Sequence, residues 1–161
     1  MSKKLRKTIA LVAHDNRKKD IAEWVAWNHE FLWHHSMICT GTTGNIIEEV
    51  FEKISETNNR PLPQIQKLKS GPLGGDQQLG ALISESKIDL LIFLWDPMQP
   101  QPHDVDVKAL LRIATLYNIP VAINRTSADF IISSPLFSSD YTIKRKDYSE
   151  YINRSVDVKT R

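Results

Sequence analysis

The sequence predicts an α/β protein: a single-domain, three-layer, Rossmann-like fold with a mainly parallel five-stranded sheet flanked by helices. Short apolar runs alternate with helical patterns along the chain, which is typical of successive strand–helix–strand units. One run, Leu90–Leu94, is apolar throughout, as expected of a strand covered on both faces. The chain of 161 residues is long enough to bury one substantial core. We therefore expect one domain over residues 1–161, with residues 1–7 and 156–161 as tails.

The strands are expected where short apolar runs end in polar or glycine-rich segments. In chain order they are Thr8–Ala13, Met37–Cys39, Ile65–Lys69, Leu90–Leu94 and Pro120–Ile123. The third run is the least apolar, because Gln66, Lys67 and Lys69 interrupt it. We therefore expect this strand near an edge of the sheet, where one side of a strand meets solvent.

Helical patterns fill the intervals between these strands. They are Asp20–Trp33, Asn45–Ile54, Gln77–Ser86, Val105–Tyr117, Ala128–Ser133 and, near the C-terminus, Tyr148–Arg154. In the fourth, apolar side chains recur from Val107 to Tyr117 at the spacing of one helix face. Trp24, Trp27 and Trp33 are expected in the core or at subunit contacts. His29, His34 and His35 are expected to face solvent.

Composition and charge exclude several classes of partner. Charged residues make up 25% and the formal net charge is only +2, too little to suggest a polyanionic ligand. The basic clusters at residues 3–7 and 144–146 lack interleaved aromatic side chains, so we expect solvated ends and no nucleic-acid partner. Cys39 is the only cysteine, which excludes an intramolecular disulfide and suits a reducing compartment. No apolar run approaches a membrane span or a signal peptide, so we expect a cytoplasmic protein with no membrane partner.

Polar and glycine-rich segments follow four of the predicted strands. Ligands of open parallel sheets bind outside the carboxyl ends of the strands, so these segments should meet at one pocket. In strand order they are His14-Asp15, Thr40–Gly44, Ser70–Asp76 and Asp96–His103.

The segment Thr40–Gly44 is expected as a loop that leads into a helix beginning near Asn45. Glycine N–H groups such as that of Gly41, threonine hydroxyls and a helix N-terminus together favour an anion. The segment is neither a Walker A motif nor a GxGxxG fingerprint. A plain strand-to-helix turn capped by threonine or asparagine explains it equally well.

Asp76 follows two glycines at the start of a predicted helix. It is either an N-cap or a carboxylate that a substrate can approach closely, and the two roles are compatible. The loop from Asp96 to His103 contains three prolines, which would hold both of these side chains in fixed places. For Asp15, Asp104 and Asp106, capping of the following helices is at least as good an explanation as catalysis.

Together these segments resemble methylglyoxal synthases. The similarity extends from about Lys7 to Tyr151 and rests on several motifs in the same order. They are Ile9–Asp15, Thr40–Asn45, Ser70–Gln78, Trp95-Asp96-Pro97 with Pro102-His103-Asp104, Asp106–Arg112 and Ala128–Ile132.

The resemblance implies conversion of dihydroxyacetone phosphate to methylglyoxal and inorganic phosphate, with no cofactor and no metal. It also implies a cytoplasmic homohexamer that phosphate inhibits cooperatively. Asp76 matches the catalytic aspartate, and Asp15, Asp96 and Asp106 match further carboxylates of the site. The positions that match substrate-holding residues are His14, Lys18, Thr40, Thr42, Thr43, Ser70, Gly71 and His103. The family's C-terminal arginine, which reaches a neighbouring subunit, falls at Ser155 here, one position after Arg154.

The chemistry suggested by these residues starts with proton abstraction by Asp76 as general base. His103, as the electrophile, would then stabilise the enediolate oxygen. Two other functions compete with this one. The first is a non-catalytic sensor of phosphorylated metabolites, as in the domains of this fold that regulate carbamoyl-phosphate synthetase and a purine-biosynthesis enzyme. The second is a metal-dependent hydrolase whose ligands would be His14, Asp15, Asp76 and His103.

Overall fold

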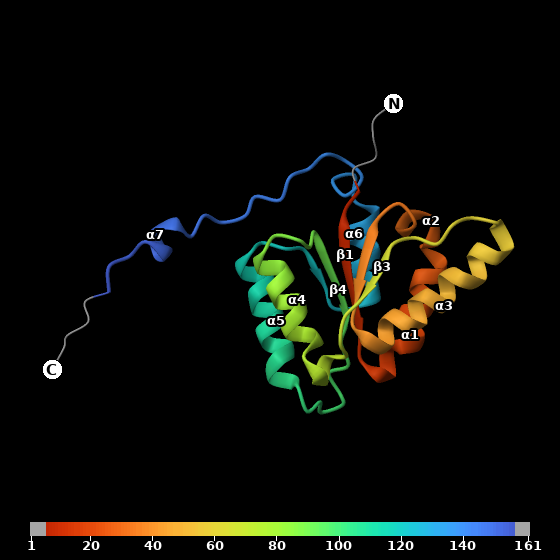
Figure 1. Ribbon diagram of the computed structural model, residues 1–161, viewed down its shortest axis with the longest axis horizontal. Coiled ribbons are helices and arrows are strands. Elements are labelled where there is room, and N and C mark those ends of the chain that lie inside the picture. The colour runs from red at the N-terminus through yellow and green to blue at the C-terminus, as the bar shows by residue number, and fades with distance from the viewer. Residues whose placement is uncertain (1–5, 157–161) are drawn as a thin grey trace.

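The computed structural model describes residues 6–156 and contains a five-stranded sheet in which every pair of neighbouring strands is parallel. The strand order is β3-β2-β1-β4-β5 (Figure 1). The strands are β1 (Thr8–Ala13), β2 (Ser36–Cys39), β3 (Ile65–Lys67), β4 (Leu90–Leu94) and β5 (Val121–Ala122). All five predicted strands are confirmed, and β3 is an edge strand that ends two residues earlier than expected.

One or more helices follow each strand. They are η1 (Asp15–Arg17), α1 (Lys18–Trp27), α2 (His29–Leu32), α3 (Gly41–Asn58), η2 (Gly71–Leu73), α4 (Gly75–Ser84), α5 (Asp104–Leu116), α6 (Arg125–Ser133) and α7 (Ser149–Ile152). The single helix predicted over Asp20–Trp33 is wrong, because the chain leaves helical geometry at Asn28. The Asn28 amide donates to the Trp24 carbonyl at 2.9 Å, which satisfies the last turn of α1 and ends it there.

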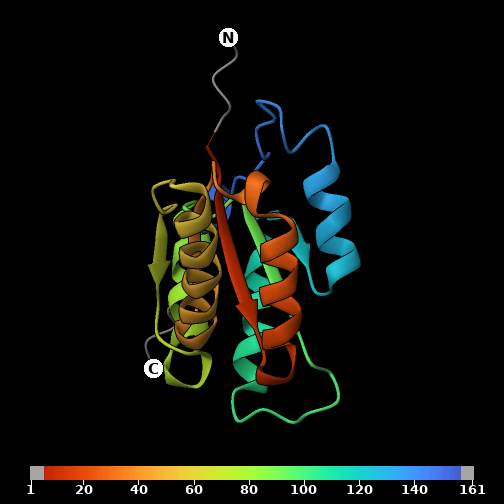
Figure 2. The same ribbon diagram turned by 90° about the vertical axis from the view of Figure 1, so that its right-hand side faces the viewer.

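The sheet separates two helical layers. Helices α1, α3 and α6 cover one face, and α4 and α5 cover the other (Figures 1 and 2). Along β1 the side chains alternate between the layers, as the two-residue period of a strand requires. Ile9 and Leu11 join the core with Trp24 and Phe51, whereas Val12 joins the core on the α4–α5 side. The predicted three-layer architecture is therefore confirmed.

The expectation for His35 is wrong, and for Trp27 one of the two expected locations is excluded. His35 does not face solvent: it is 3% exposed, and its Nδ1 accepts a hydrogen bond from the Lys7 N–H at 3.1 Å. Its ring lies against Phe31 and Phe137. Trp27 is no core residue, since it is 86% exposed and thus available for a subunit contact.

The last described segment runs away from the body of the molecule and carries α7 at its end (Figure 1). Tyr148 still anchors this segment, through a hydrogen bond of 2.8 Å from its hydroxyl to the Leu116 carbonyl. Beyond it, Tyr151 and Ile152 are exposed. Of the predicted tails, residues 1–5 and 157–161 lie outside the described residues.

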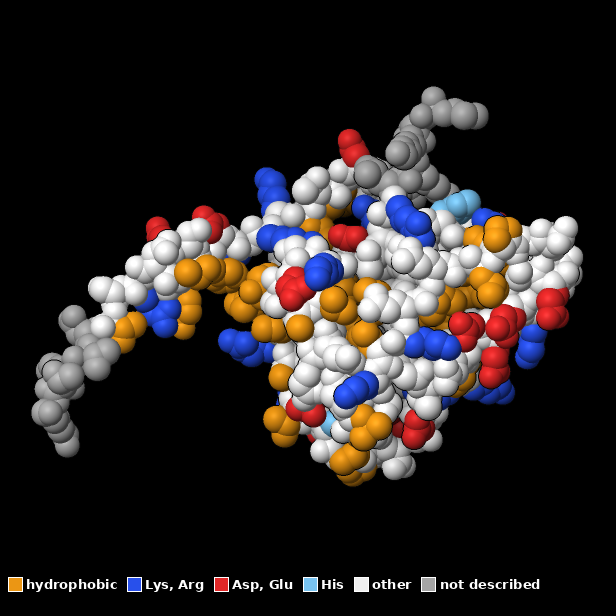
Figure 3. Space-filling model, viewed as in Figure 1, with side chains coloured by type: hydrophobic (Ala, Val, Ile, Leu, Met, Phe, Trp, Pro, Cys, Tyr) orange, Lys and Arg blue, Asp and Glu red, His pale blue; other side chains and the backbone are white. Residues whose placement is uncertain are grey.

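The surface agrees with the small net charge. In the face shown in Figure 3, Lys and Arg side chains alternate with Asp and Glu side chains, and no large area of one sign appears there. Among residues 6–156, no helix is both long and apolar enough to cross a membrane.

Candidate active site

The predicted site residues gather beyond the carboxyl ends of β1, β2 and β4. His14 directly follows β1, and its N–H donates to the Leu94 carbonyl at the end of β4 over 3.2 Å. The N–H of Asp96 in turn donates to His14 Nδ1 at 3.1 Å. These two hydrogen bonds join the loops that follow β1 and β4, so His14 and Asp96 belong to one rigid unit.

Asp76 is buried inside the site and does not cap its helix. The cap of α4 is Gly74, whose positive φ of 103° favours glycine, and Asp76 is the second residue of the helix. The Asp76 side chain is 2% exposed, and neither carboxylate oxygen has a hydrogen-bond partner among the described residues. The capping interpretation is thus wrong, because a capping oxygen would bind the helix N–H groups.

The surroundings of Asp76 make it a stronger base than an exposed carboxylate. Burial raises its pKa above the usual value; His103 opposes this rise, whereas the charge of Asp106 adds to it. His103 Nε2 lies 3.6 Å from Asp76 Oδ2, and the His103 ring is 8% exposed. A buried carboxylate without partners, next to an imidazole, is poised to exchange a proton with a bound molecule.

Gly71 forms the floor between these two side chains. A Cβ at position 71 would lie 2.8 Å from His103 Nε2 and 3.2 Å from Asp76 Oδ2. Both distances are shorter than ordinary contact, so only glycine lets the backbone come this close. The backbone of the Ser70-Gly71 segment therefore borders the space that Asp76 and His103 face.

The segment after β2 is helical, which corrects the predicted loop over Thr40–Gly44. Helix α3 begins at Gly41 and not near Asn45, with Thr40 at the cap position. The helix N-terminus leaves the N–H groups of its first turn without partners inside the helix, and its dipole favours an anion there. With 18 residues, α3 is long enough for this effect.

The first turn of α3 packs directly against the Ser70 backbone. A Cβ at Gly41 would lie 2.9 Å from the Ser70 nitrogen, and the Gly41 N–H donates to the Lys69 carbonyl at 3.2 Å. Gly41 therefore lets the first turn of α3 pack closely against Ser70. Its N–H is already bonded to Lys69 and is not available to an anion. The remaining polar groups of Thr42 and Ser70 lie on adjacent backbone segments, which together can hold a tetrahedral anion.

Lys18 adds a positive charge under the same turn. Its Nζ donates to the Ala13 carbonyl and, at 2.8 Å, to the Thr43 hydroxyl. Thr43 is fully buried and its hydroxyl also accepts from the Ala13 N–H at 3.3 Å, so it positions Lys18 more than it faces a ligand. Burial lowers the pKa of Lys18, whereas nearby Asp15 opposes that shift.

His14 is held as a neutral hydrogen-bond donor. Burial, followed by the charges of His103 and Lys18, lowers its pKa, although Asp104 and Asp96 oppose the shift. Its ring meets the ring of His103 edge-on, with centroids 5.6 Å apart. His14 Nε2 is buried and has no partner within residues 6–156. This nitrogen is available to a ligand.

The three supporting carboxylates lie in different settings. Asp15 is exposed at the start of η1, and Asp106 in α5 acts on Asp76 by its charge. Asp96 is 4% exposed, and hydrogen bonds from Asn16 and then from the Met98 N–H hold its pKa below the usual range. Sequence reasoning missed Asn16, whose side chain reaches a residue 80 positions away. No local motif marks such a contact.

The described residues offer no group of three His, Cys, Asp or Glu side chains placed to hold a metal ion. The metal-dependent alternative required His14, Asp15, Asp76 and His103 to converge as ligands. His14 instead accepts from a backbone N–H, and Asp15 is exposed. That alternative therefore has no ligand set in this part of the chain.

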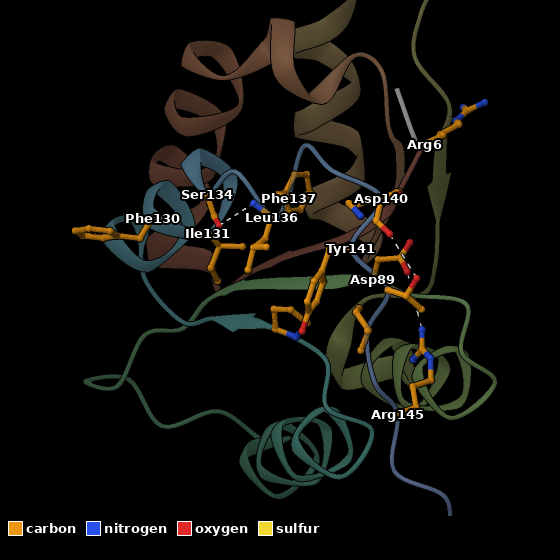
Figure 4. A pocket seen from close by; sticks show the side chains of 14 residues that line it. Arg6, Asp89, Phe130, Ile131, Ser134, Leu136, Phe137, Asp140, Tyr141 and Arg145 are labelled. Atoms are coloured by element: carbon orange, nitrogen blue, oxygen red, sulfur yellow. Dashed lines mark hydrogen bonds and ion pairs between the residues drawn. The ribbon is translucent and has the colours of Figure 1, made fainter. Parts of the chain in front are cut away.

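A separate cavity of about 620 Å³ lies at the opposite edge of the sheet, near the amino ends of β1, β4 and β5 (Figure 4). Its walls combine apolar side chains with the pair Asp89 and Arg145, whose charged atoms are 3.9 Å apart. None of the predicted site residues lines it. The apolar side chains in its lining include Ile131, Leu136, Phe137, Tyr141 and Ile143.

Comparison with known proteins decides the family. The family model described as MGS-like domain matches residues 20–123. A methylglyoxal synthase from Maridesulfovibrio salexigens is 54% identical over 153 residues, which cover 93% of this chain and 98% of that protein. The chain belongs to the methylglyoxal synthase family.

Further members of the methylglyoxal synthase family agree in sequence and in fold. The methylglyoxal synthase from Proteus mirabilis is 53% identical over 146 residues, covering 91% of this chain and 90% of that protein. The crystal structure of methylglyoxal synthase from Elizabethkingia anophelis superimposes with a TM-score of 0.81 and 46% sequence identity. It covers 94% of this chain and 93% of that one, so the family fold extends over nearly the whole molecule.

Proposed function

We propose that this protein converts dihydroxyacetone phosphate to methylglyoxal and inorganic phosphate through an enediolate intermediate, without a cofactor. In this proposal Asp76 is the general base and His103 is the electrophile. The observation that supports these roles best is the burial of Asp76. Its two carboxylate oxygens have no partner among the described residues, and one of them lies 3.6 Å from the His103 ring.

The first step is removal of a proton from the hydroxymethyl carbon next to the carbonyl group. A carboxylate with a raised pKa is better matched to this task near neutral pH than an exposed one. Asp76 lies in the first turn of α4, so the helix fixes its position. Gly71, which has no side chain, packs directly against Asp76 and His103, so a substrate held by the Ser70-Gly71 backbone would lie next to the base.

Negative charge then grows on the former carbonyl oxygen. A neutral imidazole that donates a hydrogen bond to this oxygen stabilises the enediolate, and such a donor contributes about 3 kcal/mol. His103 begins α5 as its cap residue, next to Gly71. Both the base and the donor thus act on adjacent atoms of one substrate.

The last step is loss of phosphate from the enediolate. The breaking C–O bond must stand nearly perpendicular to the enediolate plane, because only then does its orbital overlap the π system. We assign the task of holding this conformer to the first turn of α3, the Ser70-Gly71 segment, Lys18 and His14. These groups lie on adjacent segments at one edge of the sheet, and Lys18 offsets the charge of the leaving group.

A product balance tests the proposed reaction. Purified protein is mixed with dihydroxyacetone phosphate, and methylglyoxal and free phosphate are measured together. We expect the two products in equal amounts. Formation of glyceraldehyde 3-phosphate without phosphate release would indicate an isomerase, and phosphate binding without any turnover would indicate a sensor. Glu56→Gln, which removes an exposed carboxylate near the far end of α3, is the control that should retain full activity.

We further propose that the protein forms a cytoplasmic homohexamer and that phosphate inhibits it cooperatively. The exposed Trp27 and the C-terminal segment with exposed Tyr151 and Ile152 offer apolar area for subunit contacts. The Arg154 guanidinium lies 3.6 Å from the centre of the Tyr151 ring, on the segment that leaves the body of its own chain. Analytical ultracentrifugation tests the assembly, and activity measured at several phosphate concentrations tests the inhibition.

A further inference from the structure

The side chain of Asn16 links two loops of the site without belonging to the predicted set. Asn16 lies in η1, after β1, and Asp96 follows β4. The Asn16 amide donates to Asp96 Oδ2 at 2.8 Å. Because an ionised carboxylate only accepts hydrogen bonds, the amide nitrogen must be the group that faces Asp96. The contact therefore has a defined donor and a defined acceptor.

Both oxygens of the Asp96 carboxylate accept hydrogen bonds. Its second oxygen, Oδ1, accepts from the Met98 N–H at 3.0 Å, and Pro97 between them has a fixed φ. Asn16 and Met98 thus hold the carboxylate from both sides. Because Asn16 follows His14 by two residues, its contact ties the loop that carries the Asp96 backbone N–H to the segment that carries the His14 ring.

That backbone N–H sets the tautomer of His14. It donates to His14 Nδ1 at 3.1 Å, so Nδ1 must carry a lone pair and no proton. The neutral ring then carries its proton on Nε2, which is buried without a partner among the described residues. Nε2 of His14 is consequently a donor without an acceptor, and the His14 ring lies edge-on to the ring of His103 in the same site.

We propose that Asn16 is a positioning residue whose amide holds Asp96 so that His14 keeps its proton on Nε2 and donates it to the substrate. The proposal rests on the proposed function, because it gives His14 a task in that reaction. Asn16 itself makes no contact with the reacting atoms in this account. Its contribution reaches the substrate through two hydrogen bonds, from Asn16 to Asp96 and from Asp96 to His14.

Nitrogen-15 NMR of protein labelled at histidine tests the relay directly. The chemical shifts of the two ring nitrogens distinguish the tautomers, and a His14→Gln variant identifies the His14 signals among the five histidines. In the unchanged protein we expect His14 with its proton on Nε2. In Asn16→Ala we expect the Nδ1 signal to move toward the value of a protonated nitrogen, as the second tautomer becomes populated.

Kinetics provide the second readout. In Asn16→Ala we expect kcat to fall about tenfold, as is common when a group that orients a catalytic histidine is removed. Binding of inorganic phosphate should weaken less than kcat falls. Of the groups assigned to hold phosphate only His14 is affected, whereas Lys18 and the first turn of α3 remain in place. Asn16→Asp should lose more activity at pH 8, because two carboxylates would then face each other across the 2.8 Å contact.

Asn28→Ala is the matched control, because it removes an asparagine amide that donates to a backbone carbonyl at the end of α1. It should change neither the His14 signals nor kcat. The proposal is overturned if Asn16→Ala leaves the His14 tautomer unchanged, or if the unchanged protein carries the proton on Nδ1. The NMR result does not depend on turnover, so it separates a failure of this relay from a failure of the proposed reaction.

Discussion

Replacement of Gly71 by alanine tests the geometry of the site with a single methyl group. Gly71 has no positive φ, so alanine fits its backbone without strain. The added Cβ would lie 2.8 Å from His103 Nε2. Ordinary contact requires about 3.5 Å, so the His103 ring must retreat by about 0.7 Å. A shift of about 1 Å at a reacting group costs about a hundredfold in rate, so we expect kcat to fall ten- to a hundredfold.

Steady-state kinetics and circular dichroism together measure this effect. Gly80→Ala is the matched control, because a Cβ there meets its nearest neighbour, Ile113, at 3.9 Å. In this control kcat should be unchanged, and the protein should gain up to about 1 kcal/mol of stability from the better helix former. If folded Gly71→Ala turned over like the unchanged protein, His103 and Asp76 would not flank the reacting substrate, and the proposed roles would be refuted.

Three further changes probe the same structure. Asp76→Asn should be more stable than the unchanged protein at pH 8, because burial raises the Asp76 pKa and so penalises the ionised form in the fold. This advantage should shrink as pH falls through the raised pKa of Asp76 and vanish below the usual carboxyl range. Urea unfolding at several pH values measures it. A stability difference that does not change with pH would contradict the assignment of the effect to ionisation of Asp76. Gly75→Ala should lose about 3 kcal/mol or more of unfolding free energy, since its Cβ would lie 2.0 Å from the Lys69 carbonyl oxygen, and a normal melting curve would contradict this. Thr43→Val should raise KM about tenfold and cost about 1–2 kcal/mol of stability, because Lys18 loses its hydroxyl partner; an unchanged KM would place Lys18 outside the substrate site.

The strands were predictable because their burial leaves a direct mark on the sequence. Leu90–Leu94 is covered on both faces and is apolar throughout, and the polar residues of β3 indicated its edge position correctly. The strand assignments also predicted which side of the sheet carries the site, since parallel strands have their carboxyl ends on one side. This is why the sequence alone was enough to assign His14, Ser70, Asp76 and His103 to one region of the fold.

The errors arose where a tertiary contact overrode a local preference. Gly41 and Gly44 suggested a loop, yet both lie in the first turn of α3, where their missing side chains make room for Ser70 and Lys67. Glycine is unfavourable in a helix, but here close packing decides. Asp76 looked like a cap because position alone does not show whether a side chain turns to its own helix or into a buried site. The Asn16–Asp96 contact spans 80 residues and has no local signature.

The most direct test of the central claim compares turnover and phosphate binding in Asp76→Asn. If Asp76 is the base and the groups assigned to hold phosphate are separate from it, kcat should fall by about 10²- to 10⁴-fold. The dissociation constant for inorganic phosphate, measured by titration calorimetry, should stay within about twofold. The groups assigned to phosphate are His14 just after β1, Lys18 at the start of α1, the first turn of α3 and the Ser70-Gly71 segment, and none of them is changed. Full turnover in this variant, or loss of phosphate binding together with turnover, would contradict the account.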